Sequence, residues 1–106
     1  MNKETIERIR KFSADRDYEQ FHSPANLAKA ISIESGELLE CFLWDETHYS
    51  IDEVSDELAD VLVYTRNLLD KLGLDEDKIV NKKMEQNEKK YPIDKAKGNY
   101  KKYNEF

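Results

Sequence analysis

The stretch IESGELLECFLW, residues 33–44, has the apolar spacing of a helix that packs along one side. On a wheel of about 100° per residue, Leu38 and Phe42 share one apolar stripe, and Glu34 falls inside it. Glu37 lies at the edge of the same stripe. Burying a carboxylate without a partner is strongly unfavourable. The stretch therefore predicts a packed helix whose acidic side chains hold something that an ordinary core does not.

The next apolar segment repeats this arrangement. Val54, Leu58 and Val61 belong to its apolar stripe, and Glu57 and Asp60 line one edge of it. A spacing of three residues places two side chains on one helix face, about one turn apart. If the two helices are antiparallel neighbours, the four carboxylates of the two pairs converge, and a divalent cation would offset their repulsion. Oxygen ligands alone favour Mg²⁺ or Mn²⁺, then Ca²⁺, over Zn²⁺.

Capping and terminating residues indicate four helices and predict an all-α, four-helix bundle-like fold completed by oligomerisation. Ser23–Pro24 and the Ser50–Glu53 capping box are start signals, and the stretch DRDYEQFH (15–22) reads as a loop. We expect one domain over residues 1–92 and an extended tail over residues 93–106. The expected helices run from about Lys3 to Ala14, from Pro24 to about Phe42, from Ser50 to Gly73, and from Asp75 to before Pro92.

Composition narrows the class of protein. The chain has 106 residues, 38% of them charged, with three Gly and two Pro, which suits long exposed helices. Residues 1–77 carry 8 basic and 19 acidic side chains (−11), whereas residues 78–106 carry 9 and 4 (+5). An acidic body argues against a nucleic-acid polymer as partner, although a solvated surface with a basic tail would look the same.

Two further expectations concern the cellular compartment and the oligomeric state of the protein. No apolar run approaches the roughly 20 residues of a membrane span, and the start of the chain lacks a signal-peptide core. With the single Cys41, this predicts a cytoplasmic protein. Ala59 and Val63 lie nearly opposite the apolar stripe of their helix. A second packed face on so small a chain predicts a homodimer or a homotetramer built as a dimer of dimers.

Two other interpretations compete with a magnesium site. Pairs of Glu three residues apart are common on solvated helices, although two such pairs on successive helices are much rarer. Di-iron bundles also converge carboxylates but add a Glu-x-x-His motif on a helix. Here the only such spacing, Glu19 to His22, lies in the expected loop. We therefore rank the di-iron interpretation low.

Three segments together resemble the MazG-like all-α nucleotide pyrophosphohydrolases, and most closely their small dCTP pyrophosphatase-like branch. They are NLAKAISIESGELLECFLW (26–44), DEVSDELADVLVYTRNLLDKLGLD (52–75) and KKMEQNEKKYP (82–92). The resemblance covers roughly residues 10 to 92. It implies Mg²⁺-dependent hydrolysis of a nucleoside triphosphate to the monophosphate and pyrophosphate, with nucleotide-pool clean-up as the role. A non-catalytic oligomerisation or regulatory module with the same fold is the alternative.

The resemblance also implies a set of site residues. Many members carry a further Glu immediately before the first acidic position, where this chain has Ile33. The general base is therefore left open, with Glu37 preferred and Glu34 the other catalytic candidate. The implied ligands of Mg²⁺, with Mn²⁺ as the alternative, are Glu34, Glu37, Glu57 and Asp60. The implied substrate contacts are Trp44, Tyr64, Tyr18 and His22, together with Lys83, Asn87, Lys90 and Tyr91 in the basic part of the chain.

Overall fold

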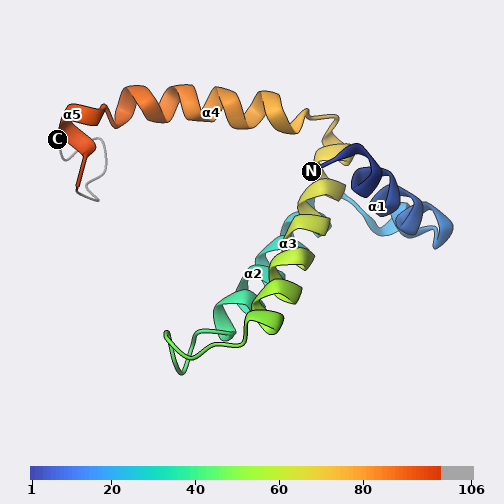
Figure 1. The fold of residues 1–106 in the computed structure, drawn as a ribbon. Helices are drawn as coiled ribbons and strands as arrows, with labels where there is room; N and C mark the ends of the chain where they lie inside the picture. The colour runs from blue at the N-terminus through green and yellow to red at the C-terminus, as the bar shows by residue number, and fades with distance from the viewer. Residues whose placement is uncertain (99–106) are drawn as a thin grey trace. The chain divides into compact units, whose positions relative to one another are not determined.

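The computed structural model describes residues 1–98, which are mostly helical (Figure 1). No strand occurs within these residues, so the all-α prediction is confirmed. The chain divides into two compact units, one over residues 1–73 and a second that begins at Leu74. In chain order the elements are α1 (Lys3–Asp15), the 3₁₀ helix η1 (Tyr18–Phe21), α2 (Pro24–Glu40), α3 (Ile51–Leu72), α4 (Glu76–Lys90) and α5 (Ile93–Ala96).

Capping residues fix the ends of α2 and α3 as the sequence predicts. The Ser23 hydroxyl accepts the N–H of Asn26 at 3.1 Å, and the Ser50 hydroxyl accepts the N–H of Glu53 at 3.3 Å. After α3, Gly73 takes the left-handed conformation (φ 65°), which glycine adopts without a Cβ clash. The serine caps determine the residue at which each helix begins. They therefore determine how far along the helix axis its pair of acidic residues lies.

The end of α2 differs slightly from the prediction, because the helix stops at Glu40 rather than near Phe42. Cys41 and Phe42 donate their N–H groups to carbonyls three residues back, at 3.2 and 3.0 Å, which tightens the chain into a turn. In the loop that follows, Asp45 Oδ1 accepts two backbone N–H groups at 2.9 and 3.0 Å. This loop reverses the chain between α2 and α3.

Within the polar stretch before α2, which the sequence predicted to be a loop, Tyr18–Phe21 form the 3₁₀ helix η1. Asp17 turns the chain with a positive φ of 54°, a conformation that Asp tolerates better than most residues. The Gln20 amide donates to the Asp17 carbonyl and to its carboxylate, both at 3.1 Å, and His22 N–H closes on Glu19 O at 3.1 Å. Local hydrogen bonds among polar side chains therefore build η1, and apolar periodicity does not reveal them.

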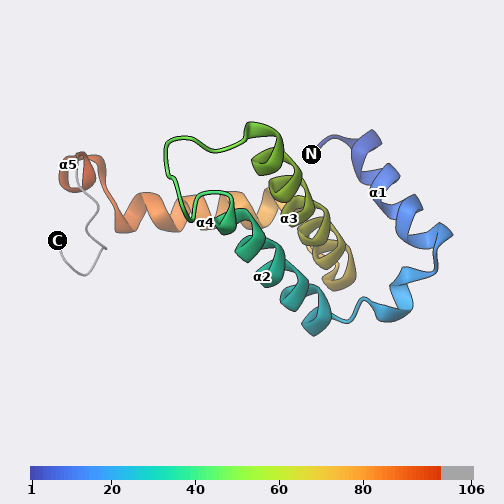
Figure 2. The ribbon, with the colours of Figure 1, turned by 90° about the horizontal axis from the view of Figure 1, so that it is seen from below.

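Helices α2 and α3 lie side by side and run antiparallel, and α1 packs against the C-terminal half of α3 (Figures 1 and 2). Leu27 on α2 and Leu69 on α3 are the buried apolar side chains of residues 1–98, at 1% and 6% exposure. Ser13 and Arg66 are buried as well. The apolar core is thin, and much of the packed surface of the first unit is polar or acidic.

The second unit contains α4 and α5. Asp75 caps α4 by accepting the N–H of Lys78 at 2.9 Å, as predicted. Beyond Pro92 the prediction of an extended tail is wrong for residues 93–96, which form the short helix α5. Pro92 supplies a fixed φ at the start of this turn, and its carbonyl accepts the N–H of Ala96 at 2.8 Å. The end of the predicted tail, residues 99–106, lies outside the described residues.

None of the helices in the described part of the chain combines the length and apolar character that crossing a bilayer requires.

Candidate metal centre

Three carboxylates meet between α2 and α3. Glu34 and Glu37 come from α2 and Glu57 from α3, and one oxygen of each lies within 4.8 Å of the others. Glu34 and Glu57 are partly buried, whereas Glu37 is exposed. The antiparallel pairing of the two helices thus brings together three of the four carboxylates that the sequence singled out. That they bind a metal stays a prediction.

The buried atoms of this cluster lack donors. Glu34 Oε2 and Glu57 Oε2 are enclosed, and within residues 1–98 neither has a hydrogen-bond partner. Enclosed carboxylate oxygens are normally hydrogen-bonded or bound to a cation, because their desolvation is otherwise uncompensated. The donor set contains only carboxylate oxygens, the ligands that hard divalent ions prefer. The residues present therefore fit a divalent cation such as Mg²⁺.

Crowding of like charges shifts the protonation of the cluster. The pKa of Glu34 is raised to about 7, first because Glu37 can share a proton with it through a hydrogen bond. Burial and the negative charges of Glu37, Asp60 and Glu57 act in the same direction. The pKa of Glu57 is also raised, again first through Glu37 and then through burial. In the absence of a cation, the cluster therefore holds a proton more readily than isolated carboxylates do.

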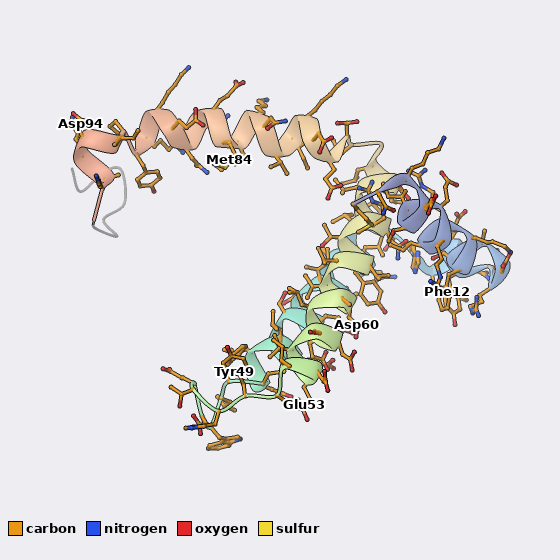
Figure 3. The ribbon with its side chains drawn as sticks, viewed as in Figure 1. Phe12, Tyr49, Glu53, Asp60, Met84 and Asp94 are labelled. Atoms are coloured by element: carbon orange, nitrogen blue, oxygen red, sulfur yellow. The ribbon has the colours of Figure 1, made fainter. Side chains whose placement is uncertain are left out.

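Asp60 stands apart from the other three predicted ligands. It is exposed, and it does not belong to the group whose oxygens lie within 4.8 Å of one another. Figure 3 shows it on α3, farther from the N-terminal end of that helix than Glu53. Its charge still raises the pKa of both Glu34 and Glu57, so it lies close enough to act on the cluster.

An acidic cavity of about 550 Å³ opens beside the cluster. Glu40 and Glu53 line it next to Glu37 and Glu57. Cys41 also lines it, donating its thiol to the Glu37 carbonyl at 3.6 Å, and burial followed by the charge of Glu53 raises its pKa. Sequence reasoning did not include Glu40 among the site residues and gave Glu53 only a capping role. Their spacing, three after Glu37 and four before Glu57, was the available signal.

The aromatic candidates lie in different places. Tyr64 is partly buried on α3, four residues after Asp60. Tyr18 stands on η1, edge-on to Phe12 with ring centroids 6.0 Å apart. Trp44 lies in the loop after α2 with 91% of its surface exposed. The structure does not bring Trp44 into the cluster, although an apolar ring this exposed is well placed to meet a ligand or another chain.

The basic candidates belong to the second unit. Lys83, Asn87 and Lys90 lie on α4, and Tyr91 follows as its C-terminal cap with its N–H bonded to the Asn87 carbonyl at 2.8 Å. Asn87, Lys90 and Tyr91 are partly buried, and Lys83 is exposed. Spacings of four and three residues put the first three on one face of α4. Their contact with a substrate stays a prediction.

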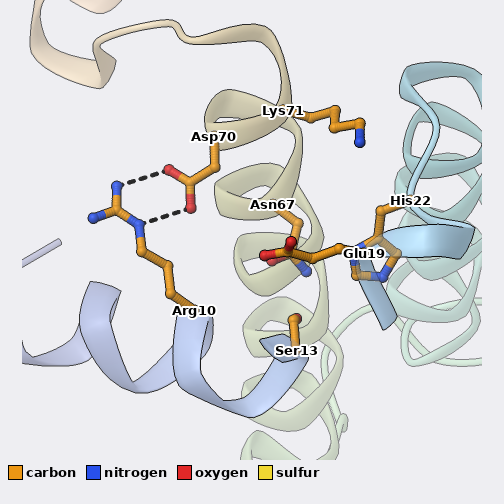
Figure 4. A pocket seen from close by; sticks show the side chains of 7 residues that line it. All are labelled: Arg10, Ser13, Glu19, His22, Asn67, Asp70 and Lys71. Carbon is orange, nitrogen blue, oxygen red and sulfur yellow. Dashed lines mark hydrogen bonds and ion pairs between the residues drawn. The ribbon is translucent and has the colours of Figure 1, made fainter. Parts of the chain in front are cut away.

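A second cavity, of about 200 Å³, lies where α1, η1 and α3 meet (Figure 4). Arg10 and Asp70 close one side through paired hydrogen bonds of 2.8 and 2.9 Å, and this pairing lowers the pKa of Asp70. Of the predicted residues only His22 lines this cavity, together with Ser13, Glu19, Asn67 and Lys71. Sequence reasoning missed Asn67 and Lys71, although they follow Asp60 by seven and eleven residues on the same face of α3.

Comparison with known proteins gives consistent results. The sequence profile of the MazG-like family matches residues 29–106. The chain is 35% identical to dCTP pyrophosphatase 1 of Rattus norvegicus and 38% identical to that of Homo sapiens, over 96% of this chain and 68% of each relative. Among solved structures, a pyrophosphatase from Archaeoglobus fulgidus matches with a TM-score of 0.75 at 40% identity, over 84% of this chain and 90% of that one.

Proposed function

The chain belongs to the MazG-like family, and we propose that it hydrolyses deoxynucleoside triphosphates, dCTP foremost, to the monophosphate and pyrophosphate. The names of its relatives support this activity, since the chain aligns over almost its whole length with dCTP pyrophosphatases. The observation that carries the proposal for this chain is the convergence of Glu34, Glu37 and Glu57, together with the enclosed oxygens of Glu34 and Glu57 that lack donors within residues 1–98. A solvated helix surface would not enclose them.

In this proposal Glu34, Glu37 and Glu57 hold Mg²⁺, with Mn²⁺ as the alternative, and Asp60 adds its charge from one turn along α3. When bound, the ion would neutralise phosphate charge and lower the pKa of a coordinated water. Within the trio, Glu37 is the exposed member. Because water reaches its carboxylate most easily, Glu37 is the better candidate to accept the proton of the attacking water, and Glu34 is the other candidate.

Cationic and aromatic side chains would bind the rest of the nucleotide. Lys83, Asn87, Lys90 and Tyr91 would contact the triphosphate, because Lys and amide donors match phosphate oxygens. Tyr64 borders the acidic pair of α3, and Tyr18 and His22 would contact the nucleoside through stacking or hydrogen bonds. Trp44 lies beyond the opposite end of α2 from His22, so it would contact a nucleotide bound to another copy of the chain.

The oligomeric state and the cellular compartment form part of the same proposal. A dimer, or a dimer of dimers, would cover apolar side chains that the isolated chain exposes, including Leu58 and Leu62 on α3. A reducing, cytosolic compartment suits the single free Cys41. Removing surplus or non-canonical deoxynucleotides there is the role that pyrophosphohydrolysis would serve.

A product assay tests the proposal. Wild-type protein incubated with Mg²⁺ and dCTP should release pyrophosphate and dCMP, whereas Glu57→Gln should turn over at least about 100-fold more slowly because it removes a ligand oxygen. Glu46→Gln, in the exposed loop after α2, is the matched control and should keep wild-type turnover. Orthophosphate in place of pyrophosphate would contradict the proposed reaction, and no product from any of the four canonical dNTPs would favour the non-catalytic module instead.

A further inference from the structure

The cavity between α1, η1 and α3 is lined by two kinds of polar group. Arg10 and Asp70 are paired with each other and hold α1 against α3. The side chains of Glu19, Asn67 and Lys71 also line it, yet none makes a hydrogen bond or ion pair within residues 1–98. Figure 4 shows these three side chains and His22 around the same space. Polar groups that share a cavity without protein partners are the groups that bind a ligand or water.

Asn67 is the most informative of these residues. It is partly buried, and within residues 1–98 no protein group bonds its side-chain amide, so the amide is available to a ligand in the cavity. Its amide carries two N–H donors and a carbonyl acceptor, and can therefore serve either hydrogen-bonding sense. Lys71, four residues later on α3, offers only donors. The pair thus presents a donor-rich, adaptable edge to the cavity.

Residues of this cavity and of the acidic pair of α3 lie on the same face of that helix. Asp60, Tyr64, Asn67 and Lys71 follow one another at spacings of four, three and four, and so share one face of α3. At about 1.5 Å per residue, Asn67 lies roughly 10 Å beyond Asp60 along the helix axis. A nucleotide with its phosphates at the carboxylates that extended along this face would pass Tyr64 and reach the cavity with its base.

The size of the cavity agrees with this placement. Its volume of about 200 Å³ is smaller than the roughly 300–1,000 Å³ of a pocket for a whole drug-sized ligand. It corresponds to several waters at about 30 Å³ each, which is the space of one ring system rather than of an entire nucleotide. The cavity therefore suits one end of the substrate.

We propose that Asn67 and Lys71 contact the nucleobase and set the base preference of the enzyme, an inference that rests on the proposed pyrophosphohydrolase function. Asn67 donates to an acceptor N3, as in cytosine, and Lys71 donates to the O2 carbonyl of a pyrimidine. Glu19, which lines the same cavity from η1, accepts from an exocyclic amino group, the pairing that carboxylates make with cytosine. A uracil would place its O4 carbonyl against that carboxylate, so cytosine should be preferred.

Asn67→Asp is the sharpest test, because it keeps the shape of the side chain and removes its donors. We expect kcat/KM for dCTP to fall about 10- to 100-fold while that for dUTP, whose N3 carries a hydrogen, falls less, so the dCTP/dUTP ratio drops at least about tenfold. Lys71→Met should lower kcat/KM for both pyrimidines. Lys29→Met, on the exposed side of α2, is the matched control and should leave the ratio unchanged.

Binding measurements separate this inference from the proposed function. Titration of dCMP and dUMP into wild type and Asn67→Asp, without turnover, should show the same change of ratio. Thermal unfolding checks that each variant folds. If Asn67→Asp does not fold, Asn67→Ser replaces it as the test variant. An unchanged dCMP/dUMP ratio in a folded variant overturns the role of Asn67. A wild type that shows this base-dependent binding but releases no pyrophosphate would refute the proposed function and leave the base site standing.

Discussion

Glu34 and Glu57 make the stability of the metal-free protein depend on pH, because folding raises the pKa of both carboxyls. The pKa of Glu34 rises from 4.5 to about 7, first because a protonated Glu34 can bond Glu37 and then because of burial. The folded state therefore binds more protons than the unfolded state between these values. It follows that the stability of the metal-free protein falls as the pH rises through this window and is lowest above about 7.

Urea unfolding of metal-free protein checks this expectation. The free energy of unfolding should be larger near about pH 5 than near about pH 8, and Glu34→Gln should flatten the dependence because its side chain cannot titrate. The pKa of Asp70 is lowered from 3.8, so that carboxylate loses its stabilising pairing only at more acidic pH and does not act in this window. A profile that Glu34→Gln leaves unchanged would remove Glu34 as the cause.

The helices show what a single sequence can and cannot predict. Ser23, Ser50, Gly73 and Asp75 act within a few residues of themselves, and local patterns therefore located the ends of α2, α3 and α4. The convergence of Glu34 and Glu37 with Glu57 followed from periodicity plus antiparallel pairing. These features depend on short-range geometry, which the order of residues specifies directly.

Other features depend on contacts that periodicity does not encode. The Arg10–Asp70 pair joins residues 60 positions apart, and the cavity it borders exists only because α1 packs on α3. From the sequence alone, Asn67 and Lys71 are therefore indistinguishable from ordinary polar residues of a helix. The structure shows that they line a cavity together with Glu19 of η1. The 3₁₀ turn of η1 and helix α5 were missed because polar and backbone hydrogen bonds, rather than apolar spacing, build them.

One face of α3 in the first unit carries a row of exposed apolar side chains. Ile51, Leu58 and Leu62 lie on one face of α3 at 65%, 45% and 49% exposure, and the buried Leu69 lies on the same face farther along the helix. An exposed strip of this kind on a chain with so thin a core indicates a partner surface. We propose that a second copy of the chain covers it.

Analytical ultracentrifugation tests this assembly. Wild type should sediment as a dimer or tetramer at micromolar concentration, and Leu62→Glu should shift it toward the monomer because a charge cannot be buried there without a partner. Asn81→Glu, which adds the same charge at an exposed polar position on α4, should leave the mass unchanged. A wild type that sediments as a monomer would contradict the proposed interface.

The central claim is that the acidic cluster between α2 and α3 is a cation site, and binding of Mn²⁺, followed by its electron paramagnetic resonance signal, tests it most directly. The account predicts that wild type binds Mn²⁺ in competition with Mg²⁺, and that Glu34→Gln, Glu37→Gln and Glu57→Gln each weaken binding by at least about tenfold while Glu46→Gln does not. Folded variants that bind Mn²⁺ as tightly as wild type would contradict the account.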